Sequence, residues 1–217
     1  MLIPVKSFRA AKARLAAVLS ESDRSRLARG MVARVIAAAR PMSTFVVCDD
    51  DDVAEFVSRH GAGVLWTPGA GLNDAVDLGV ATLAARGFDH VVIAHGDLPL
   101  ARDLARVVRP DEVVIVPDQR RDGTNVLARP IDVALPACYG PGSFGAHLQA
   151  AVSTRRRVTV LPDRSLAIDI DTVADQTHPA AAVEIDTILH DPGLHDTGLH
   201  DTGLHEIEPD WSGHERQ

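Results

Sequence analysis

The sequence predicts an α/β fold with a mostly parallel central sheet. Short apolar runs alternate along the chain with segments whose apolar residues recur every three or four positions. The clearest run, residues 91–94, is apolar at every position and ends at the turn signal His95-Gly96-Asp97. Such a run is typical of a strand buried on both faces, and open α/β sheets bind ligands at the carboxyl ends of their strands.

Length and composition exclude several classes of protein. A chain of 217 residues with 46% hydrophobic and 24% charged residues predicts one globular domain or slightly more. The net charge of −8 argues against nucleic-acid binding. No apolar run is long enough for a membrane span, and no secretory signal is seen. Cys48 and Cys138 are too few for a disulfide scaffold, so we expect a reduced, cytoplasmic protein.

The first third of the chain alternates strands with helices. Ser20 and Asp23 form a capping-box pattern at the start of a helix. Four acids at positions 49–52 lie solvated at a helix start or, alternatively, bind a metal. The expected elements are strands at residues 2–5, 44–48 and 64–66, and helices at residues 20–40 and 52–60, the second followed by Gly61 as its terminating residue.

The same alternation continues through the rest of the chain. Asp122-Gly123 is a turn that leads into a strand, and Ser143 lies at the expected N-terminus of a helix. The other expected elements are helices at residues 74–86 and 103–108, and strands at residues 91–95, 113–116, 158–161 and 166–170.

Both lysines of the chain lie close to its start. Lys6 and Lys12 are the only lysines among 22 basic residues, and Arg9 and Arg14 lie in the same polar loop. Lysine is a common phosphate ligand, so a loop with these cations directly after the first strand is a candidate triphosphate site. Two lysines are also a small sample, and a solvated basic surface would look the same.

Three aspartates are candidate magnesium ligands. Asp97 follows the central strand, where a carboxylate either binds a cation or caps a following helix. Asp169 and Asp171 are two residues apart on a predicted strand, so their side chains point to the same face. Two like charges on one face repel each other unless a cation lies between them, which favours a metal.

Two glycine-rich loops are candidate ligand sites. Gly69 and Gly71 allow a backbone to approach a ligand closely, and Asn73 can cap the next helix or hydrogen-bond a base edge. In residues 139–147, Ser143 and the neighbouring amides form either an anion site or a simple helix cap.

The chain changes character at His190. A five-residue repeat begins at Gly193, Gly198 and Gly203, and three such short repeats cannot bury a core. We therefore expect a single domain of residues 1–189 and a flexible, histidine-rich, low-complexity tail of residues 190–217 with no role in catalysis.

Six segments, taken in order, resemble the guanylyltransferases of deazaflavin coenzyme (F-420) biosynthesis, which act on 2-phospho-L-lactate or phosphoenolpyruvate. The segments are IPVKSFRAAKARL, GLNDAV, HGDLPL, DGTNVL, YGPGSFGAH and DIDT, and the resemblance covers about residues 1–177. It implies a three-layer α/β/α sandwich of the nucleotide-diphospho-sugar transferase (Rossmann-like) type with a mixed, mostly parallel sheet. The implied reaction transfers GMP from GTP to a small phosphorylated three-carbon acid and releases pyrophosphate.

The resemblance also implies roles for particular residues. The acids that match its magnesium ligands are Asp97, Asp169 and Asp171. The residues that match its triphosphate-binding basic motif are Lys6, Lys12 and Arg14. The residues that match its phosphoenolpyruvate contacts are Thr124, Gly140 and Ser143. The residues in its loop near the guanine are Gly71 and Asn73. Asp97 and the three basic residues are the expected catalytic groups.

Several alternatives stay open at this point. The acceptor is phosphoenolpyruvate, 2-phospho-L-lactate or 3-phospho-D-glycerate, and the arginine-rich, lysine-poor composition favours the first by association with bacteria of high GC content. A sugar-phosphate or molybdopterin nucleotidyltransferase would need a glycine-rich opening loop, which is missing. A non-catalytic nucleotide-binding module predicts the loss of a metal acid, yet all three are present. A homodimer is compatible with the sequence, which carries no interface signature.

Overall fold

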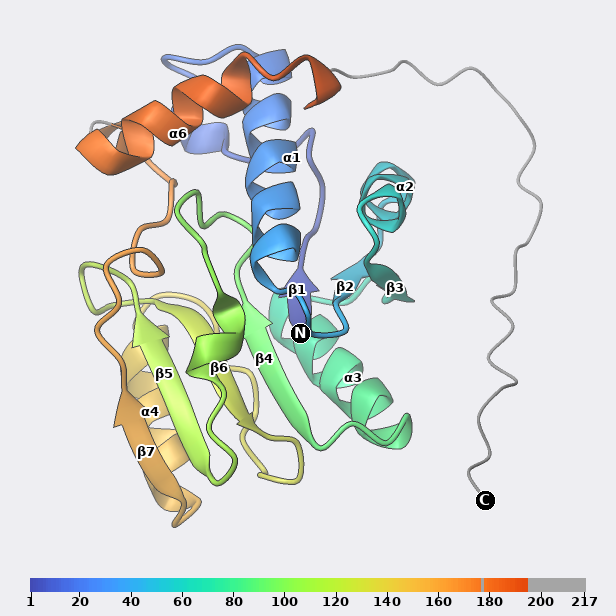
Figure 1. Ribbon diagram of the computed structural model, residues 1–217, viewed down its shortest axis with the longest axis vertical. Coiled ribbons are helices and arrows are strands. Elements are labelled where there is room, and N and C mark those ends of the chain that lie inside the picture. The colour runs from blue at the N-terminus through green and yellow to red at the C-terminus, as the bar shows by residue number, and fades with distance from the viewer. Residues whose placement is uncertain (177, 195–217) are drawn as a thin grey trace, which may run out of the picture.

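The computed structural model describes residues 1–176 and 178–194, in which helices cover both faces of a seven-stranded sheet (Figure 1). The strands lie in the order β3-β2-β1-β4-β6-β5-β7. Only β6 is antiparallel to its neighbours, so the sheet is mixed and mostly parallel, as predicted. The strand bounds are β1 Leu2–Pro4, β2 Phe45–Cys48, β3 Gly63–Trp66, β4 His90–Ala94, β5 Glu112–Pro117, β6 Thr124–Pro130 and β7 Arg157–Val160.

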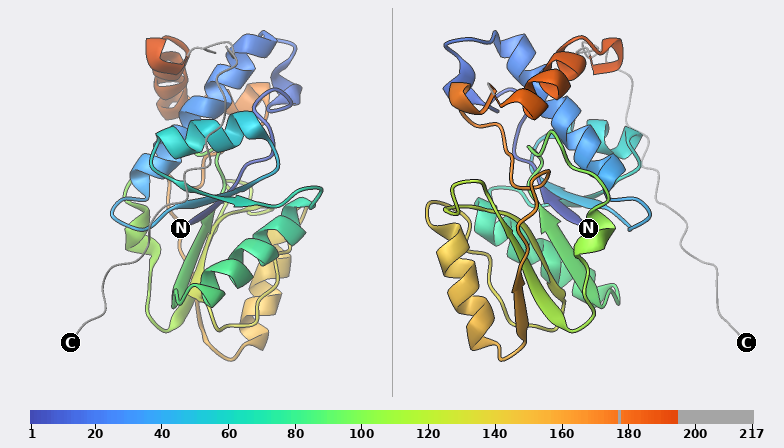
Figure 2. Two further views of the ribbon diagram at one scale, coloured as in Figure 1. Left: turned by 90° about the vertical axis from the view of Figure 1, so that its right-hand side faces the viewer. Right: turned by 60° about the vertical axis from the view of Figure 1, so that its left-hand side comes forward.

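The helices form the two outer layers of a three-layer α/β/α sandwich. Helices α1 and α2 pack on one face of the sheet with α6 against α1, and α3 and α4 cover the other face (Figure 2). The helix bounds are α1 Glu21–Ala38, α2 Asp51–Arg59, α3 Leu72–Ala85, α4 Ser143–Ser153, α5 Val173–Gln176 and α6 Pro179–Leu189, with 3-10 turns at Ala13–Leu15, Leu104–Val107 and Pro192–Leu194.

Strand β4 shows why the central apolar run has no polar position. Val92 and Ala94 point into the core beneath α1 and α2, whereas Val91 and Ile93 point into the core beneath α3 and α4. Successive side chains of a strand point to opposite faces, so a strand covered on both faces is apolar at every residue. This confirms the prediction of a doubly buried central strand.

Local signals set several helix ends as the sequence predicts. The Asp23 amide donates to Ser20 Oγ at 3.1 Å, which starts α1. In the acidic run, Asp50 Oδ1 accepts the Val53 amide at 3.1 Å and caps α2. Gly61 has φ +82° directly after that helix, a conformation that favours glycine. The acidic run is therefore a helix start.

One predicted strand is absent, and the structure excludes two helix caps that the sequence left open as alternatives. Residues 166–170 form no strand, because the sheet ends at β7 and this segment begins with a turn and a bend and pairs with no strand of the sheet. Helix α3 begins at Leu72 with Gly71 at its N-cap, so Asn73 is not the cap. Asp97 is followed by a turn and not by a helix that it could cap. Helices α5 and α6 were not predicted.

The described chain ends at a buried residue. Leu194 belongs to the same core as α1 and α6, and its Cδ1 atom would lie 3.0 Å from a Cβ atom added at Gly30. Core packing thus continues five residues beyond the predicted domain end at residue 189. The repeats from residue 195 onward lie outside the described residues. Within residues 1–176 and 178–194, no helix has both the length and the apolar content that a membrane crossing requires.

Candidate active site

A cleft of about 570 Å³ opens at the edge of the sheet where β4 ends. Strand β6 is antiparallel to β4, so its first residue, Thr124, lies at this edge together with Asp97, which follows β4. Three distant segments therefore meet here: the turn after β4, the start of β6 and the segment after β7. Of the predicted site residues, those that line the cleft are Arg14, Asp97, Thr124, Gly140, Ser143, Asp169 and Asp171.

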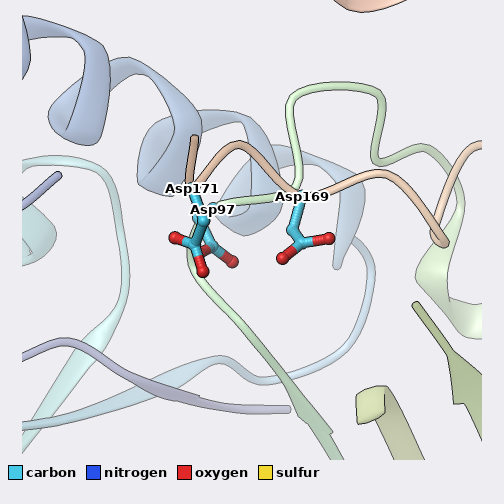
Figure 3. Close-up of side chains that lie close together, drawn as sticks. All are labelled: Asp97, Asp169 and Asp171. Carbon is cyan, nitrogen blue, oxygen red and sulfur yellow. The ribbon is translucent and has the colours of Figure 1, made fainter. Parts of the chain in front are cut away.

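Three carboxylates of the cleft lining gather in one place, and we call them the acid corner (Figure 3). Asp97, Asp169 and Asp171 each offer one oxygen, and these oxygens lie within 4.8 Å of one another. Asp97 Oδ1 is buried and has no hydrogen-bond partner among the described residues. Oxygen ligands of this kind suit a hard divalent cation such as Mg²⁺, so the residues present fit a magnesium site.

Lys12 reaches into the acid corner, although the sequence placed it among the residues that hold the triphosphate. Its Nζ atom lies 2.7 Å from Asp97 Oδ2 and 2.8 Å from Asp171 Oδ1, and its side chain is only 8% exposed. Burial lowers the pKa of Lys12, but the two carboxylates raise it more, so the amine stays charged. Lys12 has φ +55°, an unusual conformation for a residue with a side chain.

The lysine leaves one acid without a compensating charge. Burial raises the pKa of Asp97, yet the ammonium group of Lys12 more than offsets this, and the pKa of Asp97 is lowered. The pKa of Asp169 is instead raised to about 6, first by burial and then by the negative charges of Asp97 and Asp171. The acid corner thus carries more negative charge than Lys12 neutralises, which favours the binding of a further cation.

Two buried hydroxyl groups also line the cleft, and we call them the hydroxyl corner (Thr124 and Ser143). Both residues line the cleft and are almost fully buried. The Thr124 amide donates to Ser143 Oγ at 3.0 Å, which links the start of β6 to the start of α4. These hydroxyls are neutral donors suited to an anionic ligand.

The backbone amides at the start of α4 are largely engaged within the protein. The Ser143 amide donates to the Gly140 carbonyl at 3.1 Å, and the Phe144 amide donates to the Asp122 carbonyl at 2.9 Å. The Gly142 amide donates to the Asp122 carboxylate at 3.2 Å. Anion binding at this helix start therefore depends on the hydroxyls more than on these three amides.

A second hollow of about 300 Å³ adjoins the main cleft, since His95 and Leu72 line both. Lys6 and Gly71 line this second hollow, whereas Arg14 lines the main cleft. The three predicted basic residues are therefore spread over three places: the acid corner, the main cleft and the second hollow.

Asn73 lies beside this hollow with its amide group engaged. Its Oδ1 atom accepts the Tyr139 amide at 2.7 Å, and its Nδ2 atom donates to the Tyr139 carbonyl at 3.1 Å. The side chain thus ties α3 to the loop that carries Gly140 and Ser143. Its contribution to the site in this structure is to hold that loop in place.

Two supporting residues escaped the sequence reasoning although signals for them exist. Asp175 Oδ2 accepts the amides of Asp171 at 3.1 Å and Thr172 at 2.7 Å, and so fixes the end of the acidic segment. Thr172 and Asp175 have the spacing of a capping box. His147 lies one helical turn after Ser143, a spacing that places both on the same face of a helix.

Gly96 also has a structural role that its sequence context did not reveal. A Cβ atom at this position would lie 2.9 Å from the Val32 side chain of α1. The glycine is therefore required by close packing of the β4 turn against α1, which holds Asp97 at the edge of the cleft.

The three-layer sandwich around a mixed, mostly parallel sheet is a fold of the nucleotide-diphospho-sugar transferase type. A crystal structure from Desulfovibrio desulfuricans G20, assigned to the nucleotide-diphospho-sugar transferases, matches with a TM-score of 0.65 and 18% identity over 87% of this chain and 95% of that one. At this identity the likeness establishes the fold alone. The predicted fold class is confirmed.

The family follows from the sequence comparisons. A family model described as "Guanylyl transferase CofC like" matches residues 1–179, and the chain belongs to this family. The phosphoenolpyruvate guanylyltransferase of Rubrobacter xylanophilus is 38% identical over 80% of this chain and 89% of its own length. The 2-phospho-L-lactate guanylyltransferase of Methanothermobacter thermautotrophicus is 31% identical over 80% of each chain. The resemblance found in the six sequence segments is confirmed.

Proposed function

We propose that this protein transfers GMP from GTP to the phosphate of phosphoenolpyruvate, which gives enolpyruvyl-diphospho-5′-guanosine and pyrophosphate in deazaflavin coenzyme (F-420) biosynthesis. The observation that carries the proposal is one cleft, in a chain of the guanylyltransferase family, that combines a cluster of three carboxylates with two buried hydroxyl donors. A phosphate oxygen of the acceptor attacks the α-phosphorus of GTP, the bond to the β-phosphate oxygen breaks, and pyrophosphate leaves.

Asp97, Asp169 and Asp171 are the residues that would hold Mg²⁺. When bound, this ion supplies the positive charge that lets two anionic phosphates approach each other. The acceptor phosphate is already an anion and needs no strong general base. The task of the protein is therefore to supply charge and alignment, and clustered acids with a lysine between them suit that task better than a proton-transfer residue would.

Lys12, Lys6 and Arg14 contribute positive charge from different sides. Lys12 Nζ lies 2.7 Å from Asp97 Oδ2 and 2.8 Å from Asp171 Oδ1, beside the place where these acids would hold the cation, and supplies positive charge there for phosphate oxygens. Arg14 lines the main cleft and Lys6 lines the adjoining hollow beside Gly71. These three residues stabilise the triphosphate and the departing pyrophosphate in our proposal.

Thr124, Gly140 and Ser143, which line the same cleft, bind the acceptor in our proposal. Two hydroxyl donors on rigid elements align a phosphorylated acid with the triphosphate, and alignment of two reactants is a large source of rate acceleration. Phosphoenolpyruvate is our preferred acceptor because the relative of 38% identity is named for it, against 31% for the relative named for 2-phospho-L-lactate.

The decisive experiment measures pyrophosphate release. The protein is incubated with GTP and MgCl₂ and, separately, with phosphoenolpyruvate, 2-phospho-L-lactate or 3-phospho-D-glycerate. We expect the highest kcat/KM with phosphoenolpyruvate and little activity when ATP or CTP replaces GTP. Release with another acceptor alone would move the assignment to that acid. No release with any of the three would contradict the transferase proposal.

A further inference from the structure

His147 is a buried polar residue for which the reaction described above has no role. It lies on α4 and is 0% exposed. Its Nε2 atom lies 2.9 Å from the backbone nitrogen of Cys138, and its Nδ1 atom lies 3.0 Å from Thr124 Oγ1. It therefore joins the loop before α4 to one of the two hydroxyls in the hydroxyl corner.

These two contacts determine where the proton of the ring lies. The Cys138 backbone nitrogen can only donate, so Nε2 must accept and carries no proton. Burial lowers the pKa of His147 to about 4, with a smaller contribution from His95, so the ring is neutral at neutral pH. A neutral ring with a bare Nε2 has its proton on Nδ1, and Nδ1 then donates to Thr124 Oγ1.

The orientation of the Thr124 hydroxyl follows from this tautomer. Because Oγ1 accepts from His147, its own proton must point elsewhere, and no residue within the described ranges receives it. Thr124 lines the cleft, so the open direction is toward a bound ligand. Ser143 Oγ similarly accepts the Thr124 amide at 3.0 Å and keeps its own proton for another acceptor.

We propose that His147 is a positioning residue that holds the Thr124 hydroxyl as a hydrogen-bond donor to an anionic oxygen of the phosphorylated acid. This inference rests on the proposed function, since it concerns the acceptor site of that reaction. His147 on α4 thus sets the direction in which the Thr124 hydroxyl donates. The hydroxyl corner therefore favours an ionised carboxylate or phosphate oxygen over a group that must itself donate a hydrogen bond.

Two variants separate this role from a purely structural one. In His147→Asn the side-chain amide can replace Nδ1 as the donor to Thr124, but nothing accepts the Cys138 amide. In His147→Gln the amide oxygen can replace Nε2 as the acceptor for Cys138, but the donor to Thr124 is lost. We expect the KM for phosphoenolpyruvate to rise about 10- to 100-fold in His147→Gln and to stay within about threefold in His147→Asn. The KM for GTP should not change in either.

A double-mutant cycle shows whether His147 acts through Thr124. In a Thr124→Val background, His147→Gln should have no further effect on the KM for phosphoenolpyruvate. Gln149→Ala, on the exposed face of α4, is the matched control and should leave both KM values unchanged. The proposal would be overturned if the KM for phosphoenolpyruvate rose equally in the two variants, rose only in His147→Asn, or stayed unchanged in His147→Gln. Additive effects in the double-mutant cycle would also overturn it.

A measurement on the unmodified protein tests the same point without a variant. The ¹⁵N chemical shifts of the His147 ring should show the Nδ1-protonated neutral tautomer from pH 5.5 to 8. A ring protonated on Nε2, or a charged ring in that range, would overturn the proposal. A wild-type protein that releases no pyrophosphate would contradict the proposed function, whereas an active wild type with an unimpaired His147→Gln variant would contradict this inference alone.

Discussion

The acid corner and the hydroxyl corner of the cleft hold their groups in opposite ways. In the acid corner, Lys12 neutralises part of the negative charge, while Asp169 is left with a raised pKa and Asp97 Oδ1 with no partner among the described residues. In the hydroxyl corner, Thr124 and His147 are neutral, and the amides around them are satisfied. One corner carries unbalanced charge, and the other is a neutral hydrogen-bond network in which the hydroxyl protons of Thr124 and Ser143 stay available to a ligand.

This difference indicates which kind of ligand each corner is suited to bind. An unbalanced cluster of carboxylates gains stability from an added cation, so its geometry and charge are completed by binding. In the hydroxyl corner, hydrogen bonds within the protein already orient both hydroxyls, so the arrangement changes little when a ligand accepts their protons. The unbalanced charge of the acid corner therefore lowers the stability of the metal-free protein. The hydrogen bonds of the hydroxyl corner hold rigid the part of the site that aligns the acceptor.

The largest effect should come from Asp97, the acid that β4 delivers to the cleft. Asp97→Asn keeps the shape of the side chain and removes its charge, so we expect turnover to fall about 1,000-fold or more while the fold is retained. Pyrophosphate release and circular dichroism check this. Asp51→Asn, on the exposed start of α2, is the matched control. Near-normal turnover of Asp97→Asn would show that the reaction does not need the Asp97 carboxylate. The acid corner would then have no catalytic role that distinguishes it from the hydroxyl corner.

Lys12→Met should have the second-largest effect, on stability without metal. It leaves Asp97 and Asp171 uncompensated, and because Asp171 is 47% exposed we expect a loss of about 2–3 kcal/mol in the free energy of unfolding, less than for a fully buried pair. Urea unfolding with a chelator at pH 7.5 measures it, and MgCl₂ should restore part of the loss. Lys6→Met, at an exposed position, should change stability by less than about 0.5 kcal/mol. Equal stability of the Lys12 variant and the wild type would show that the acid corner is not charge-unbalanced.

Asp169→Asn should stabilise the metal-free protein in a pH-dependent way. The folded-state pKa of about 6 lies above the ordinary value of 3.8, so the folded protein binds this proton more tightly than the unfolded chain does. Tighter proton binding by Asp169 therefore stabilises the folded wild type below pH 4, and this stabilisation is lost as the pH rises toward 6. We expect the variant to gain about 1–2 kcal/mol at pH 7.5, allowing for solvent screening, and nothing at pH 4.

Urea unfolding with a chelator at the two pH values measures this gain. Added MgCl₂ should then stabilise the wild type at pH 7.5 more than it stabilises Asp169→Asn. A variant less stable than the wild type at pH 7.5 would contradict the charge imbalance inferred for the acid corner.

The smallest effects should come from truncations at the end of the chain. Removal of residues 195–217 should leave kcat unchanged within about twofold, because every group used in the proposed reaction precedes them. Truncation after residue 190 also removes Leu194, whose side chain packs in the core near Gly30, and should cost about 1–2 kcal/mol of stability. The two truncations are compared by thermal unfolding and pyrophosphate release. A large loss of kcat on removal of residues 195–217 would show that the tail takes part in the reaction.

Much of the fold could be predicted because its signals are local. The apolar run of β4, the Ser20 cap of α1 and the glycine after α2 each depend on a few neighbouring residues. The failures arose where contacts are distant. Residues 166–170 alternate like a strand, but whether they pair depends on where the sheet ends. Asn73 looks like a helix cap, yet its amide bonds Tyr139, which is far along the chain.

The sequence by itself determined the residue types of the site and the family of the chain, because six short segments carry them in order. Only the tertiary structure decided which groups those residues contact and therefore what each of them does in the site. It directs Lys12 onto the acids, engages the amides at the start of α4, and places His147 behind Thr124. The physical reason is that charge compensation and hydrogen-bond direction depend on distances between atoms, and residues far apart in the chain reach those distances only when the sheet brings β4, β6 and the segment after β7 to one edge.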